Sequence, residues 1–149
     1  MMPSWGTFSQ SASELSQFGH TRLTRSVAYL ATVRADGSPR VHPVTPIISD
    51  DNLFVFMEPT SPKGKDLLRD RRYTLHCGVE SNDGGGGEFY VRGTATLIED
   101  DTIRQEAIEA SNYNPKERYI LFRLDINFAF MNTYDDGSPN VRRWKADNV

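Results

Sequence analysis

The fold is decided by the stretch from residue 27 to residue 48, which reads VAYLATVRADGSPRVHPVTPII. Residues 27–34 are apolar on both alternating faces, which is typical of a strand buried in a barrel. The turn sequence Asp36-Gly37-Ser38-Pro39 follows and predicts a hairpin, because Gly37 can adopt a positive φ. Residues 40–48 form the returning strand, so the whole stretch is predicted to be an antiparallel hairpin.

Further strands are predicted at 53–58, 73–80, 88–97 and 119–131, with a short one around 142–145. Polar and apolar residues alternate in 88–97, where Gly93 marks a position at which a barrel strand could bend. The strand 119–131 is predicted to present one apolar face, made of Ile120, Phe122, Leu124, Ile126 and Phe128. Short strands at regular spacing with few helices indicate a mainly β protein with an antiparallel barrel. No G-x-G-x-x-G motif joins a strand to a helix, so a Rossmann fold is not expected.

Helices are predicted between these strands. One or two short helices are expected in 11–26, with an interruption at Gly19 and Thr21. A capping box of Thr102 and Gln105 predicts a helix that ends near residue 111. We expect the chain, residues 1–149, to be a single domain whose helical N-terminal segment, 1–25, packs on the barrel.

Composition excludes several classes of partner. The formal net charge is −3, whereas binding to nucleic acid needs a cationic excess, so no nucleic acid partner is expected. No apolar run is long enough to cross a bilayer, so no membrane contact is expected. The single cysteine, Cys77, excludes an internal disulfide and fits a reducing compartment, so we expect a cytoplasmic protein.

The start of a third predicted helix carries the strongest chemical signal. The sequence EPTSPKGK at residues 58–65 places Ser61 as N-cap and Pro62 at the first helical position. Lys63 and Lys65 then lie in the first turn, which is the unfavourable end of the helix dipole for a cation. Together with the Thr60 and Ser61 hydroxyls and the backbone N–H groups they could form a phosphate site. The residues alone leave open that both lysines are simply solvated.

The second strand carries two prolines, Pro43 and Pro46, so it is predicted to be an edge strand or locally unpaired. Its free backbone groups could bind the polar edge of a flat heterocycle, or the prolines could only protect the edge from aggregation.

The histidines, His20, His42 and His76, are far apart in sequence, so no metal site is expected. At the C-terminal end, Trp144 could close one end of the barrel or cover a cofactor, with Arg142 close to an anion.

Three blocks together, LATVRADGSPRVHPVTPI, LFVF and SPKGKDLLRDRR, resemble the pyridoxamine 5′-phosphate oxidase-like superfamily of FMN-binding split barrels. The resemblance implies a six-stranded antiparallel split β-barrel and a homodimer with FMN at the subunit interface. It implies that the isoalloxazine ring is bound by His42, Val44 and Thr45, and the ribityl phosphate by Thr60, Ser61, Lys63 and Lys65. Arg142 and Trp144 would approach the cofactor from the partner subunit.

The function implied is an oxidoreductase that moves a hydride between a flavin and a small organic substrate of unknown identity. No side chain can be named as a catalytic acid or base from spacing alone. The first alternative replaces FMN by the deazaflavin coenzyme F-420, whose long anionic tail would be held by Arg69, Arg71, Arg72 and Arg142. The second is a non-catalytic protein that binds flavin or haem, with His42 or His76 as axial ligand.

Overall fold

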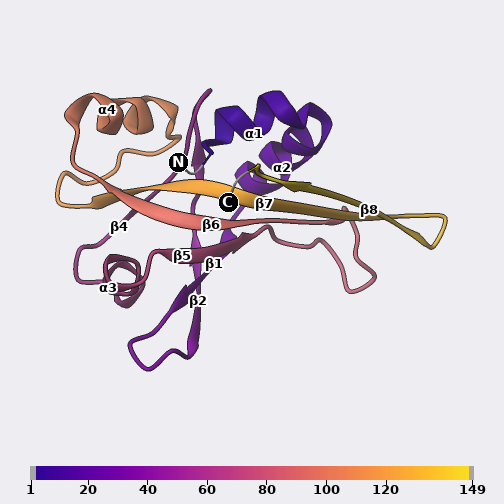
Figure 1. Ribbon diagram of the computed structural model, residues 1–149, viewed down its shortest axis with the longest axis horizontal. Helices are drawn as coiled ribbons and strands as arrows, with labels where there is room; N and C mark the ends of the chain where they lie inside the picture. The colour runs from indigo at the N-terminus through magenta and orange to yellow at the C-terminus, as the bar shows by residue number, and fades with distance from the viewer. Residues whose placement is uncertain (1–2, 148–149) are drawn as a thin grey trace.

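Figure 1 shows the computed structural model, in which residues 3–147 are described, as one curved antiparallel sheet with helices packed around it. The elements in chain order are α1 (Trp5–Ser11), α2 (Ser13–Arg25), β1 (Ala28–Val33), β2 (Pro39–Val44), β3 (Ile47–Ile48), β4 (Leu53–Met57), α3 (Pro62–Arg69), β5 (Arg72–His76), β6 (Glu88–Ile98), α4 (Asp101–Ala110), β7 (Ile120–Asp135) and β8 (Ser138–Lys145). The mainly β class is confirmed. The sheet has eight strands where the family resemblance implied six. Thr45 and Pro46 separate β2 from β3, and the short strand expected around 142–145 is the longer strand β8.

The two ends of the sheet are connected directly by the chain. Its hydrogen-bonded order is β2-β1-β5-β6-β7-β4-β3, so the two outermost strands of this path, β2 and β3, are consecutive in sequence. β8 lies off this path and pairs with β7. β7 pairs with β6 along one edge, whereas its other edge pairs first with β4 and then, from Phe128 onward, with β8. Because the same edge of β7 pairs first with β4 and then with β8, the sheet is divided into two parts, which is the split arrangement.

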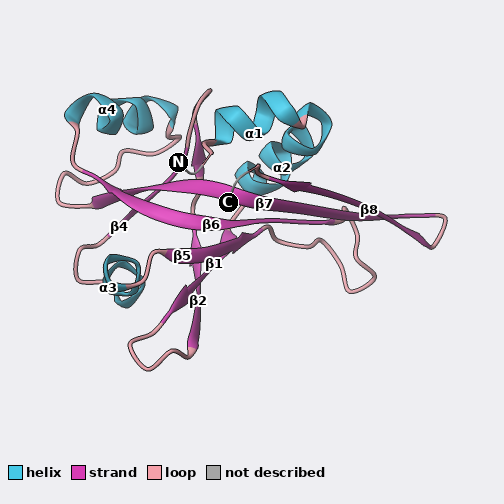
Figure 2. Ribbon diagram, in the orientation of Figure 1, coloured by secondary structure: helices cyan, strands magenta, loops and turns pink. Residues whose placement is uncertain are grey.

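The helices lie on two sides of the long strands. Figure 2 shows α1, α2 and α4 on one side of β6 and β7 and α3 on the other side. The main core lies between α1, α2 and the inner face of the sheet, and its fully buried side chains include Phe8, Leu23, Leu30, Phe89 and Phe122. Within residues 3–147 no helix is both long and apolar enough to cross a membrane.

A β-bulge bends β6 and β7 where Gly93 predicted a bend. Arg92 pairs with Phe128 but Gly93 pairs with Ile126, so Asn127 is an extra residue on β7. A Cβ on Gly93 would lie 2.0 Å from the carbonyl oxygen of Asp125, so only glycine fits there. The alternation of β7 reverses after Asn127, and the prediction that Phe128 shares a face with Ile126 is therefore wrong. Phe128 instead lies on the outer face, 4.3 Å below the Arg92 guanidinium.

Two predictions about the helices are also wrong. Gly19 does not interrupt the N-terminal helix; the break is at Ala12, and α2 runs through Gly19. A Cβ on Gly19 would lie 2.2 Å from the ring of Phe89, so this glycine allows the helix to approach the sheet. The N-cap of α4 is Asp100, which accepts a hydrogen bond of 3.0 Å from the Ile103 N–H, and Thr102 lies inside the helix.

Replacing Gly93 with Ala is expected to lower the free energy of unfolding by about 1–3 kcal/mol, because the new methyl group meets backbone that cannot move aside. The measurement is urea unfolding. Gly78 is the matched control, because a Cβ there meets nothing closer than 3.6 Å. Gly78→Ala should be neutral or stabilising by up to about 1 kcal/mol. Equal effects of the two substitutions would contradict the role assigned to the bulge.

Candidate functional site

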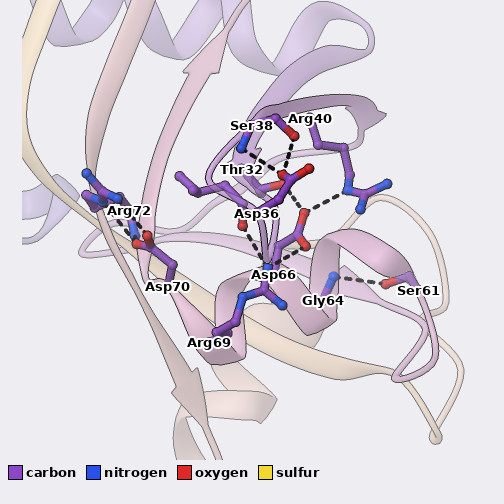
Figure 3. Close-up of polar contacts among 11 residues, drawn as sticks. Thr32, Asp36, Ser38, Arg40, Ser61, Gly64, Asp66, Arg69, Asp70 and Arg72 are labelled. Atoms are coloured by element: carbon purple, nitrogen blue, oxygen red, sulfur yellow. Dashed lines mark hydrogen bonds and ion pairs between the residues drawn. The ribbon is translucent and has the colours of Figure 1, made fainter.

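Helix α3 begins as predicted. The Ser61 hydroxyl accepts a hydrogen bond of 3.2 Å from the Gly64 N–H and donates one of 2.8 Å to the Glu58 carbonyl (Figure 3). Pro62 occupies the first position, where a missing N–H costs nothing. The space beside Gly64 is narrow, since a Cβ there would lie 3.0 Å from the Ser61 oxygen. The hydroxyl of Ser61 is thus occupied by the cap, and this residue shapes the helix start.

A buried carboxylate, Asp66, fixes α3 against the first two strands (Figure 3). Its Oδ2 accepts hydrogen bonds from the Thr32 hydroxyl (2.8 Å) and from the Nε of Arg40 (2.7 Å). Its Oδ1 accepts one of 3.0 Å from Arg69, which also donates to the Val33 carbonyl. Burial acts to raise the pKa of Asp66, but the hydrogen bonds from Arg40, Thr32 and Arg69 outweigh it and lower the pKa below its ordinary value.

Sequence reasoning missed Asp66 and Arg40. The available signal was an acidic residue directly before the buried Leu67 of a short helix. A carboxylate beside an apolar position needs a cationic partner, but nothing in the sequence says which arginine supplies it.

Lys63 is half-buried, and this burial lowers the pKa of its ammonium group. No carboxylate oxygen lies within 4.0 Å of it in residues 3–147. The pKa of His42 is lowered first by burial and then by the charges of Lys63 and Arg40, while Asp66 acts in the opposite direction. A neutral imidazole and an ammonium group without a counter-ion therefore lie close together, an arrangement suited to an anion.

A cavity of about 360 Å³ opens beside α3. Its lining consists of Arg34, Ala35, Asp36, Arg40, Thr60, Pro62, Lys65, Asp66 and Arg69. Of the predicted phosphate ligands, Thr60 and Lys65 line this cavity, whereas Lys63 does not. The two lysines are separated by about 200° around the helix axis, so they lie on different sides of α3.

The second strand has the predicted edge position. β2 is the first strand of the sheet path, and among the described strands it pairs with β1 alone. Val44 is 8% exposed and belongs to the core, whereas Thr45 is exposed in the break before β3. His42, on the same side of β2 as Arg40, is half-buried and close enough to Lys63 for the charge of Lys63 to act on its pKa. Its imidazole can both donate and accept a hydrogen bond.

Arg142 and Trp144 lie elsewhere in the protomer. The indole N–H of Trp144 donates a hydrogen bond of 3.0 Å to the Ser11 hydroxyl, and its ring lies 5.0 Å from that of Phe8. Arg142 forms an ion pair with Glu14. Both residues of β8 thus contact α1 and α2, whereas α3 lies on the other side of the sheet (Figure 1). Within one protomer the structure does not bring them to the α3 site.

The remaining histidine candidate, His76, is already bound on both ring nitrogens. Its Nε2 lies 3.1 Å from the Glu88 carboxylate and its Nδ1 lies 2.5 Å from the carbonyl oxygen of Cys77. Contact with Cys77, with support from Glu88, raises the pKa of His76 to about 9. No group of three or more potential metal ligands is found in the described part of the chain.

Comparison with known proteins gives one family. The family profile described as pyridoxamine 5′-phosphate oxidase matches residues 20–125. No curated protein matches the sequence.

Several solved structures are similar in fold. A haem binding protein from Mycobacterium smegmatis has a TM-score of 0.63 and 17% identity over 84% of this chain, which spans 57% of that protein. The general stress protein 26 of Bacillus anthracis has a TM-score of 0.63 and 19% identity over 88% of this chain and 98% of that one. A NimC/NimA family protein from Clostridium acetobutylicum has a TM-score of 0.67 and 14% identity over 89% of this chain and 93% of that one. At these identities the likeness is one of fold.

Replacing Asp66 with Asn is expected to lower the free energy of unfolding by about 3 kcal/mol at neutral pH, because Arg40 and Arg69 lose their buried counter-charge. The folded-state pKa of Asp66 lies below the ordinary value of 3.8. Its stabilising effect is therefore complete above that value and is lost as the pH falls through the lower, folded-state pKa. Urea unfolding should show a constant difference between wild type and variant down to about pH 5, narrowing below about pH 4.

The matched control is Glu14→Gln, which breaks an exposed ion pair with Arg142 and should cost less than about 1 kcal/mol. A difference for Asp66→Asn that stays unchanged down to about pH 2 would disprove the assigned ionisation.

Proposed function

Because the chain belongs to the pyridoxamine 5′-phosphate oxidase family, we propose that it binds FMN at the start of α3 and is a flavin-dependent oxidoreductase acting on a small organic molecule. The observation that carries this proposal is the half-buried ammonium group of Lys63, which has no carboxylate within 4.0 Å among residues 3–147. A buried cation without a partner costs free energy, and a phosphate dianion would offset this cost.

The phosphate of FMN would be held mainly by Lys63 and by the N–H groups of the first turn of α3. Ser61 contributes by capping this turn, and the exposed Thr60 hydroxyl is free to donate toward the phosphate. Lys65, which lines the cavity on the other side of the helix, would act on this phosphate only at longer range. These groups fit a phosphate, because all of them are cations or hydrogen-bond donors.

The flat ring system would lie along the β2 edge. His42 has a lowered pKa, so at neutral pH its imidazole is neutral and can donate or accept a hydrogen bond. Val44 would offer its main chain, and the exposed Thr45 its main chain and hydroxyl. When bound, the flavin supplies the hydride transfer, and these residues supply binding and orientation. No residue of the chain is assigned as acid or base.

We further propose a homodimer with the cofactor between the subunits. The outer face of the sheet exposes Val41 and Tyr29, with exposed fractions of 62% and 47%. Beyond β5 in the sheet order, Tyr90 of β6 and Phe130 of β7 stack with ring centroids 5.1 Å apart. They lie on the face where Phe128 lies beside Arg92. An aromatic and aliphatic surface of this kind suits burial against a second copy. Arg142 and Trp144 contact α2 and α1 on the opposite face of the sheet, so their proposed approach to the partner's cofactor would need a contact beyond this surface.

The alternative cofactors have less support from the residues expected to bind them. The four arginines assigned to a deazaflavin tail already bind other groups: Arg69 binds Asp66, Arg71 binds Ala95 and Thr96, Arg72 binds Asp70, and Arg142 binds Glu14. For haem, both ring nitrogens of His76 already contact the Cys77 carbonyl and the Glu88 carboxylate, which leaves His42 as the axial ligand of that alternative.

The visible absorption spectrum of the purified protein, or of the protein after reconstitution, separates these cofactors. We expect the two bands of oxidised flavin. A single band in the deep blue region would indicate the deazaflavin, and a Soret band would indicate haem. Either result would replace FMN in the proposal.

Lys63→Ala is expected to weaken FMN binding by about 1.5–3 kcal/mol, the value of a charge-assisted hydrogen bond. Riboflavin, which lacks the phosphate, should bind wild type and variant equally. Quenching of flavin fluorescence measures both affinities, and Lys116→Ala, at an exposed lysine outside the site, is the control. An equal loss for riboflavin and FMN would show that Lys63 does not hold the phosphate.

Val41→Asp is expected to shift the dimer toward monomers, because it places a charge in an apolar surface that the dimer would bury. Sedimentation velocity measures the association, and Tyr113→Asp, at an exposed apolar residue outside the sheet, is the control. FMN affinity should fall together with dimerisation, since the site is shared. A Val41→Asp protein that remains dimeric would place the interface elsewhere.

A further inference from the structure

The cavity beside α3 carries an excess of positive charge that a phosphate held by Lys63 would leave unused. Four cations line it, Arg34, Arg40, Lys65 and Arg69, against two carboxylates, Asp36 and Asp66. Figure 3 shows Asp36, Arg40, Asp66 and Arg69 converging from the β1–β2 hairpin and from α3.

Both carboxylates already accept hydrogen bonds from neighbouring residues of the hairpin and of α3. The two oxygens of Asp66 accept from Thr32, Arg40 and Arg69. The Oδ1 of Asp36 accepts hydrogen bonds from the N–H (2.9 Å) and the hydroxyl (2.5 Å) of Ser38. They therefore hold the hairpin and the helix in place. The donors to Asp36 are neutral, so its charge remains, and its pKa is lowered by Ser38 and, to a smaller extent, by the charge of Arg34. With four cations against two carboxylates, the cavity keeps an excess of two positive charges.

Two cations of the cavity form no ion pair within residues 3–147. Neither Arg34 nor Lys65 has a carboxylate oxygen within 4.0 Å in the part of the chain that the structure describes. Arg40 uses only its Nε in the pair with Asp66, so the two terminal nitrogens of its guanidinium remain available. The three groups come from the end of β1, from β2 and from α3, and they line one volume.

This charge is separate from the group assigned to the FMN phosphate. Lys63 does not line the cavity, because it lies on a different side of α3, near His42. The cavity volume of about 360 Å³ falls within the range of sites for small organic ligands, about 300–1,000 Å³. It can therefore hold an organic anion larger than a single phosphate ion.

We propose that this cavity binds a second anionic group, a phosphate or a carboxylate, in addition to the phosphate held by Lys63. The inference rests on the proposed function in that the FMN phosphate is assigned to Lys63. The group can come from an extended anionic tail on the cofactor or from a separate anionic substrate, and in both cases Arg34, Lys65 and Arg40 provide the recognition.

Two titrations distinguish the two sources. The first measures the affinities of riboflavin, FMN and FAD for wild type, Arg34→Ala and Lys65→Ala by flavin fluorescence; FAD serves as the probe with a longer anionic tail. The second titrates the FMN-saturated proteins with inorganic phosphate and with succinate by calorimetry. Lys116→Ala is the control, and Lys65→Arg should restore binding because it restores the charge.

If the anion belongs to the cofactor, Lys65→Ala and Arg34→Ala should weaken FAD binding at least about tenfold and FMN binding less than about threefold. If it belongs to a substrate, FAD should behave as FMN does, and phosphate or succinate should bind the FMN-saturated variants at least about tenfold more weakly. Both side chains are exposed, so the variants should fold, and circular dichroism checks this.

Two results would overturn the inference. One is that neither variant changes the binding of FAD, phosphate or succinate. The other is that Lys65→Ala weakens FMN binding as much as Lys63→Ala does, which would mean a single anion site. Failure of the proposed function looks different, since no flavin would bind at all. Phosphate titration of the flavin-free Lys65→Ala and Lys63→Ala proteins would then still test the cavity.

Discussion

The position of the candidate site depends on one buried carboxylate. Asp66 is 3% exposed and connects β1, β2 and α3 through Thr32, Arg40 and Arg69. An isolated buried carboxylate is strongly unfavourable, and only three simultaneous donors make this one tolerable. The helix start can therefore adopt one orientation relative to the β2 edge, the one in which Lys63 lies next to His42 and Lys65 lies in the cavity.

The sheet supplies the second constraint. β7 needs one extra residue, Asn127, to change partners from β4 to β8 while its pairing with β6 continues. The same residue turns Phe128 outward, so the bulge that bends the sheet also creates part of the aromatic outer face. One backbone irregularity thus connects the curvature of the fold with the surface that we assign to the second subunit.

Local features of the sequence predicted local structure well. The helix at 62–69 with its Ser61 cap, the edge position of β2 and the bend at Gly93 follow from residue types at fixed spacing. Features that depend on long-range contacts were not predictable. Gly19 was expected to break a helix because nothing nearby in sequence shows that Phe89 packs against it. For the site, the cationic start of α3 was foreseen from Lys63 and Lys65, whereas two partners of Asp66, Arg40 and Thr32, lie 26 and 34 positions away in sequence and could not be foreseen.

The contact of Trp144 with the N-terminal helices bears on how the chain acquires this structure. Its hydrogen bond to Ser11 spans 133 positions of sequence, and its ring covers Phe8 in the main core. Contacts of such separation cost the most loop-closure entropy and form late. During synthesis on the ribosome, α1 and α2 therefore emerge long before the strand that covers them, and the apolar face around Phe8 stays open to solvent or to a chaperone until β8 has been translated.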